Sequence, residues 1–182
     1  MNTPNKVKNH MVSLHKPLVN LILLCSLAIS LSGCGSSRNV GHRNANVPAK
    51  NIGLTKKESL LIDQAKSFIG TPYQWGGDSK QGMDCSGLIY QSFNAIDIDV
   101  PRTTQELIHQ GRKIAPSKLK PGDLVFFKTL KSKAKATHVG LVTQRTKNET
   151  LFIHSGTTSG VTISKLGDTY WKKHFVFARR IW

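Results

Sequence analysis

The sequence predicts an α+β domain in which helices come first and a run of antiparallel strands follows. Two stretches between residues 55 and 96 repeat apolar side chains at helical spacing. After Pro121 and Gly122 the pattern changes to short segments rich in β-branched and aromatic residues, as is typical of strands. Helices followed by consecutive strands favour an antiparallel sheet with the helices packed on it.

Two longer helices and one short one are predicted. The first begins after Thr55, a good capping residue, and ends at Gly70, with apolar positions at Leu60, Leu61, Ala65, Phe68 and Ile69. A Gly-rich loop, GTPYQWGGDSKQGMD, leads to the second helix over residues 85–96, for which Asp84 is the expected N-cap. The third covers residues 104–111.

Five strands are predicted after the helices. Their segments are DLVFFK, THVGLVT, TLFIHS, VTISK and HFVFARRIW. The polar stretch TQRTKNE between the second and third segments indicates a hairpin.

Residues 1–33 are predicted to be a signal peptide and not part of the fold. The segment begins with three lysines and no acidic residue, and its apolar stretch, residues 18–31, is shorter than the roughly 20 residues that span a bilayer. It ends in Leu31-Ser32-Gly33-Cys34, which is similar to the bacterial lipobox, whose cysteine is acylated. We therefore expect a lipid anchor at Cys34.

The lipid anchor predicts a location in the bacterial envelope. Glycine at position 35, directly after the cysteine, resembles the pattern of lipoproteins sorted to the outer membrane, so we expect the protein there, facing the periplasm. Residues 34–54 combine the lipidated cysteine with a flexible tether rich in Gly, Ser and Asn, and residues 55–182 form the domain. The formal charge of +16 predicts an anionic partner. Export excludes nucleic acid and leaves wall polymer, lipid head groups or a generally basic solvated surface.

Cys85 is the one free thiol expected in the exported protein, because Cys25 leaves with the signal peptide and Cys34 carries lipid. Such a thiol is either a small core residue or is retained for its reactivity. It stands at the start of a predicted helix, where N–H groups and the helix dipole stabilise a thiolate. The preceding Gly-rich loop can offer N–H groups to an oxyanion. Both features favour a nucleophile.

A cysteine nucleophile needs an imidazole partner, and His138 and His154 are the candidates. His42 falls in the tether, whereas His109 and His174 stand among polar residues. His138 and His154 instead lie in apolar strand segments and become cross-strand or diagonal neighbours if those segments pair. One then acts as the base and the other orients it.

Five motifs in order resemble the NlpC family of papain-like peptidases that act on bacterial peptidoglycan. The resemblance extends from residue 59 to residue 182, and the lipoprotein members with a Tyr170-Trp171-Lys172-Lys173 pattern are the most similar. The motifs are Asp84-Cys85-Ser86-Gly87-Leu88, Pro101-Arg102-Thr103-Thr104, Lys120-Pro121-Gly122-Asp123-Leu124-Val125-Phe126-Phe127, His138-Val139-Gly140 and Phe152-Ile153-His154.

The resemblance implies a papain-like core and hydrolysis of peptide bonds in the stem or cross-link peptides of peptidoglycan, without a cofactor. It implies these roles: Cys85 as the nucleophile, His138 as the base, His154 as the residue that orients it, and Tyr73, Asp84 and Ser86 in the substrate groove.

Three other functions stay open at this point. One is an inactive lipoprotein that binds the wall through the same groove, and another is a thiol amidase or acyltransferase on the same fold. The third is a zinc site formed by Cys85, His138 and His154, although the HExxH and CxxC spacings are absent. The sequence does not choose between the D-alanine cross-link and a bond within the stem peptide.

Overall fold

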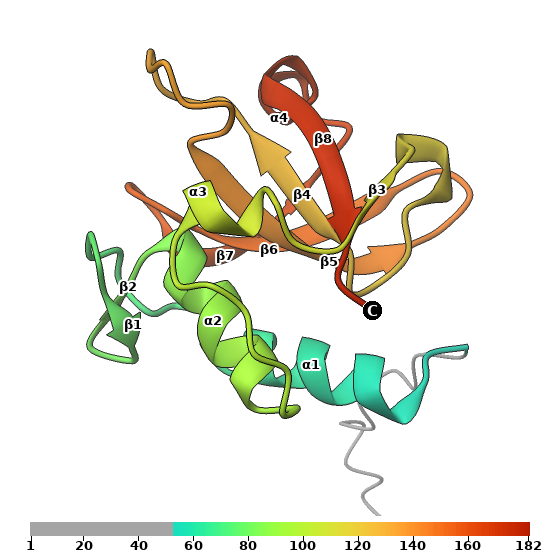
Figure 1. The fold of residues 1–182 in the computed structure, drawn as a ribbon, viewed down its shortest axis with the longest axis horizontal. Coiled ribbons are helices and arrows are strands. Elements are labelled where there is room, and N and C mark those ends of the chain that lie inside the picture. The colour runs from blue at the N-terminus through green and yellow to red at the C-terminus, as the bar shows by residue number, and fades with distance from the viewer. Residues whose placement is uncertain (1–52) are drawn as a thin grey trace, which may run out of the picture. The chain divides into compact units, whose positions relative to one another are not determined.

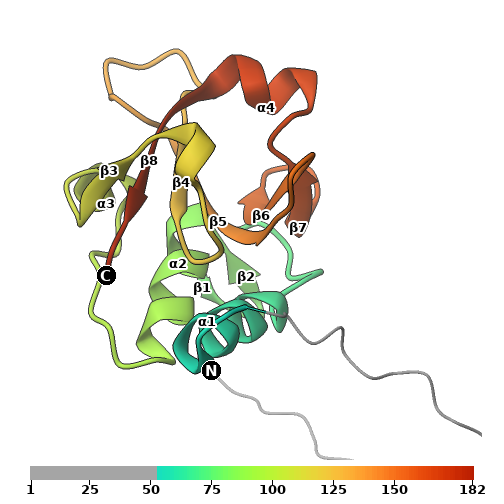
Figure 2. The same ribbon diagram turned by 90° about the vertical axis from the view of Figure 1, so that its right-hand side faces the viewer.

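The computed structural model describes residues 53–182, so the predicted signal peptide, Cys34 and nearly all of the tether lie outside the described residues. Within this range, helices α1 and α2 pack on one side of a six-stranded sheet and helix α4 lies on the other (Figures 1 and 2). The predicted α+β class, with N-terminal helices on an antiparallel sheet, is confirmed.

The six-stranded sheet has the order β3-β8-β4-β5-β6-β7, and all neighbouring strands are antiparallel. A separate two-stranded ribbon is formed by β1 and β2. The helices are α1 (Lys56–Lys66), α2 (Cys85–Asn94), α3 (Thr104–Leu107) and α4 (Thr169–His174), with a 3-10 turn at Pro116–Lys118. The strands are β1 (Asp78–Ser79), β2 (Gly82–Met83), β3 (Arg112–Ile114), β4 (Leu124–Phe127), β5 (His138–Arg145), β6 (Thr150–Gly156), β7 (Gly160–Lys165) and β8 (Phe175–Arg180).

Helix α1 begins in a capping box, because the Thr55 hydroxyl accepts the Glu58 N–H while the Glu58 carboxylate accepts the Thr55 N–H. The expected apolar face is partly wrong. Leu60 is 50% exposed, because the arc of the helix that meets the core is narrower than the apolar pattern suggested. Ile69, which is 52% exposed, lies beyond the end of α1 at Lys66. The residues that pack inward are Leu61, Ile62, Ala65 and Phe68.

Helix α2 is the central helix of the domain, and its first five residues are all buried. Asp84 caps it as predicted, accepting the Gly87 N–H at 2.6 Å. Its apolar residues Leu88, Ile89 and Phe93 form one core cluster with the face of the sheet that α1 and α2 cover. The packing therefore fixes Cys85, the first residue of α2, against the sheet.

Strand β4 is buried along its whole length because both faces of the sheet are covered. Leu124 and Phe126 face α2, whereas Val125 and Phe127 face a second apolar cluster to which Trp171 of α4 contributes. The five predicted strands are all present as β4–β8. These five strands could be predicted without knowledge of tertiary contacts, because each carries a continuous or alternating apolar pattern.

Several boundaries differ from the prediction. Helix α1 ends at Lys66 and not at Gly70, and α2 ends at Asn94 and not at residue 96. The third helix ends at Leu107, not at residue 111, because Ile108 already forms its C-cap and Gly111 adopts a φ of +60°. His174, expected to begin the last strand, is the last residue of α4. No helix within residues 53–182 is long and apolar enough to cross a membrane.

Candidate active site

Cys85 lies at the N-terminus of α2 with its thiol directed at the start of strand β5. Its side chain is 9% exposed, and its Sγ lies 3.7 Å from Oγ1 of Thr104 in α3. Burial raises the pKa of the Cys85 thiol, while the Val139 N–H and the Thr104 hydroxyl oppose this rise. Val139 directly follows His138, so the sulfur lies next to the backbone that carries the predicted base.

His138 and His154 are brought together by the hairpin of β5 and β6, as predicted. The register pairs Leu141 with Ile153, so His138 and His154 are diagonal neighbours on the same face. His138 Nε2 and His154 Nδ1 lie 3.2 Å apart. His154 Nε2 lies 2.9 Å from Oγ of Ser164 on β7, which extends the row of polar groups by one residue.

Both imidazoles are neutral near pH 7. Burial, together with the charge of His154, lowers the pKa of His138 to about 3. Burial lowers the pKa of His154 to about 4. A neutral His138 whose Nε2 faces His154 has Nδ1 free to accept a proton.

Trp171 of α4 covers this pair of histidines. Its indole stacks on His138 with ring centroids 5.6 Å apart and an interplanar angle of 22°. The same indole meets His154 edge-on at 4.6 Å, and it also packs on Phe127 and Phe152. The side chain therefore holds both imidazoles in place and keeps water from them. It was not predicted as a site residue, because only tertiary packing brings α4 to the histidines.

Asp84 is the centre of a hydrogen-bond cluster beside the thiol. Its carboxylate accepts the Gly76 N–H at 2.9 Å, the Ser86 hydroxyl at 3.0 Å and Nη1 of Arg102 at 3.0 Å. Burial alone would raise the pKa of Asp84, but the bonds from Arg102 and Gly87 outweigh it and lower this pKa. Arg102 also donates to the Gly77 carbonyl at 2.9 Å, so this unpredicted residue fixes the Gly-rich loop to α2.

Tyr73 lies in the same region, on the loop before β1. Its backbone forms an isolated bridge with Met83, and its side chain is partly buried. Burial raises the pKa of Tyr73, and the negative charges of Cys85 and Asp84 add to this rise. The phenol is therefore close to both groups, and the structure brings all six predicted site residues of the domain to one end of α2.

Within residues 53–182, no group of three His, Cys, Asp or Glu side chains has an arrangement that could hold a metal ion. Cys85, His138 and His154 thus do not form a zinc site in this structure.

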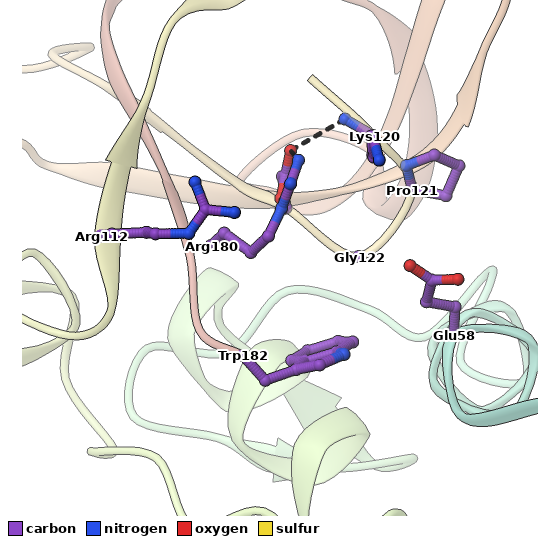
Figure 3. A pocket seen from close by; sticks show the side chains of 8 residues that line it. Glu58, Arg112, Lys120, Pro121, Gly122, Arg180 and Trp182 are labelled. Atoms are coloured by element: carbon purple, nitrogen blue, oxygen red, sulfur yellow. Dashed lines mark hydrogen bonds and ion pairs between the residues drawn. The ribbon is translucent and has the colours of Figure 1, made fainter. Parts of the chain in front are cut away.

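A hollow of about 230 Å³ lies apart from these residues, between α1, the turn before β4 and the end of β8 (Figure 3). Its two carboxylates already have partners. Asp123 is paired with Arg180 at 2.6 Å and accepts the Lys120 N–H, while Glu58 belongs to the capping box of α1. None of the residues that line the hollow carries a thiol or an imidazole. The ion pair between Asp123 and Arg180 fixes β8 to the turn before β4.

Comparison with known proteins decides the family. A family model described as the NlpC/P60 family matches residues 70–180. The chain belongs to the NlpC/P60 family. The prediction of an NlpC-type cysteine peptidase is thereby confirmed.

The relatives in this family include enzymes of Escherichia coli K12. The "Probable endopeptidase NlpC" of that strain is 38% identical over 163 residues, which cover 87% of this chain and 97% of the relative. "Murein DD-endopeptidase MepS/Murein LD-carboxypeptidase" is 29% identical over 187 residues, covering 91% of this chain and 96% of the relative.

Solved structures of the family share the fold. A protein of the NLP/P60 family from Staphylococcus aureus, described as similar to lipoprotein, has 30% identity and a TM-score of 0.62, covering 70% of this chain and 42% of that one. The NlpC/p60 domain of the peptidoglycan hydrolase SagA has 26% identity and a TM-score of 0.55, covering 67% of this chain and 97% of that one.

Proposed function

We propose that this chain is a cell-wall cysteine endopeptidase that hydrolyses peptide bonds in the stem or cross-link peptides of peptidoglycan. The observation that carries the proposal is the row formed by Ser164, His154 and His138, because the residue after His138, Val139, bonds through its backbone N–H to the Cys85 thiol. The murein endopeptidases among its relatives support the substrate class.

In the proposed first step, His138 takes the Cys85 proton as the sulfur attacks the carbonyl carbon of the scissile bond. Proton acceptance at Nδ1 requires that His138 Nε2 carries hydrogen and donates to His154 Nδ1. His154 Nε2–H then donates to the Ser164 hydroxyl. This single direction of donation holds His138 in the tautomer that acts as a base.

The proton on His138 next passes to the leaving amine, and the acyl group remains on Cys85 as a thioester. Water, deprotonated by the same imidazole, hydrolyses the thioester and restores the thiol. The N-terminus of α2 provides positive potential where the oxyanion develops. This chemistry uses side chains and backbone of the chain alone.

The groove next to the thiol is assigned to Tyr73, Asp84 and Ser86. The ionised Asp84 carboxylate and the Tyr73 phenol offer an acceptor and a donor to the peptide backbone or an amino group. Ser86 is already bonded to Asp84, so its part is to fix the carboxylate in position.

The anchor is part of the proposal. Residues 1–33 are removed as a signal peptide, Cys34 is lipidated, and residues 34–54 tether the domain to the outer membrane on its periplasmic side. Mass spectrometry of the protein purified from membranes tests this, since the N-terminal peptide is expected to begin at an acylated Cys34. An unmodified residue 34, or release of the wild-type protein in soluble form, would argue against the anchor.

The activity is tested by incubating purified protein with muropeptides and separating the products by chromatography. New fragments with a free amine are expected from the wild type and not from Cys85→Ala. Mass spectrometry of the fragments identifies the bond, so an amidase or acyltransferase would be recognised by its different products. Intact muropeptides after incubation with the wild type would exclude the proposed activity.

A further inference from the structure

The connection between β4 and β5 carries concentrated positive charge beside the proposed active site. Residues 128–137, here called the lysine loop, contain four exposed lysines, and no acidic residue occurs between residues 124 and 148. Within residues 53–182, none of these lysines takes part in a salt bridge. The four ammonium groups therefore face solvent without a neutralising partner. They belong to Lys128, Lys131, Lys133 and Lys135.

Hydrogen bonds hold the lysine loop in a defined position. The Thr137 hydroxyl accepts the N–H groups of Thr129 at 2.9 Å and Leu130 at 3.2 Å, which closes the neck of the loop. Nε2 of Gln105 donates to the Ala136 carbonyl at 2.7 Å and fixes the loop to α3. The lysines are thus presented from a fixed base.

This base borders the proposed catalytic residues on two sides. The lysine loop ends directly before His138, and the helix to which it is fixed begins with Thr104, whose hydroxyl contacts the Cys85 sulfur. Figure 1 shows the loop extending from the end of β4 above α3. Lys135 lies over the Phe177 ring at 5.4 Å, on the sheet face that α2 covers. The charge therefore lies on the α3 side of the groove.

We propose that the lysine loop binds carboxylates of the substrate, so that the enzyme prefers acidic stem peptides to their amidated forms. This inference rests on the proposed peptidase function. Stem peptides offer free carboxylates on glutamate, on the diamino acid and at the chain end, close to the bonds that an endopeptidase cuts. Exposed ammonium groups attract such anions, accelerate their binding and lose this effect as salt increases.

An anionic membrane is the other surface that lysines attract, and Leu130 in the loop is 59% exposed. A loop lying on a bilayer would turn the adjacent groove toward lipid and away from the wall peptide. The position beside Cys85 and His138 therefore favours the substrate.

The test compares K131Q/K133Q/K135Q with the matched variant K56Q/K57Q/K118Q, which removes three exposed charges elsewhere. Each protein is given a cross-linked muropeptide with free carboxylates and the same muropeptide with those carboxylates amidated. For the acidic substrate, kcat/KM of the lysine-loop variant is expected to fall about tenfold through KM, consistent with three exposed ion pairs. The loss is expected to disappear on the amidated substrate and to shrink in high salt.

An equal loss in the matched variant, an equal loss on the amidated substrate or no loss at all would overturn the inference. Unchanged kinetics with weaker binding to phosphatidylglycerol vesicles would assign the loop to the membrane instead. Failure of the proposed function is distinguishable, because the wild type would then cleave neither substrate.

Discussion

Acidification from about pH 7.5 to about pH 5.5 is expected to destabilise the folded domain by roughly 3 kcal/mol, because two histidines are buried in their neutral form. In the folded protein the pKa values of His138 and His154 are lowered to about 3 and about 4, from an ordinary value of 6.5. In this pH range the unfolded chain binds protons at both residues and the folded protein does not. The free energy of unfolding therefore falls as pH falls below about 6.5.

The magnitude follows from the unfolded state. At one pH unit below its ordinary pKa, protonation of each histidine stabilises the unfolded state by about 1.4 kcal/mol, so the two together stabilise it by roughly 3 kcal/mol. The contribution keeps growing until the pH approaches the folded pKa values. Asp84 adds almost nothing here, because its ordinary pKa of 3.8 in the unfolded chain and its lowered pKa in the folded protein both lie below this pH range.

Urea denaturation of the purified protein at both pH values measures this difference. His154→Gln is expected to halve the change in the free energy of unfolding between the two pH values, whatever its effect on stability at neutral pH. His109→Gln is the control, because His109 is exposed and its replacement is expected to leave the dependence unchanged. Equal stability at the two pH values, or the same slope in His154→Gln, would refute the reasoning.

Three further predictions concern catalysis and the groove. The plot of kcat/KM against pH is expected to show a plateau across neutral pH with its acid limb below about pH 5, because His138 is protonated only near pH 3; a rate rising steadily up to about pH 10 would contradict this. Trp171→Ala is expected to lower kcat at least about tenfold and to shift the acid limb to higher pH, because water that reaches His138 raises its pKa, whereas Trp171→Phe is expected to keep more activity. An unchanged pH profile would refute this role. Asp84→Asn is expected to lower the free energy of unfolding, measured by urea denaturation, by about 2 kcal/mol, since the charged hydrogen bond to Arg102 is lost. Unchanged stability would show that the cluster is not structural.

Local patterns in the sequence were sufficient for five of the six strands of the sheet, all but β3, and for the two histidines. Strands β4–β8 each carry an apolar pattern, and the hairpin of β5 and β6 follows from the polar turn between them. Because alternation fixes the face of each side chain, the pairing of His138 with His154 could be predicted before any coordinates.

Contacts between distant segments could not be predicted in this way. Ser164, Trp171 and Arg102 reach the site from β7, from α4 and from the segment before α3, and nothing in their local sequence indicates where they dock. The ribbon of β1 and β2 has two residues per strand, too few for any periodicity. The exposed face of α1 at Leu60 was missed because an apolar pattern does not define how wide the covered arc is.

The central claim, that Cys85 attacks the scissile bond, is tested most directly by trapping the acyl-enzyme. Wild-type protein is mixed with a cross-linked muropeptide, quenched in acid within the first turnover, digested and analysed by mass spectrometry. We predict a mass increase equal to the acyl fragment on the peptide that contains Cys85, absent from Cys85→Ala. Release of products without an adduct at Cys85, together with full activity of Cys85→Ala, would contradict the account.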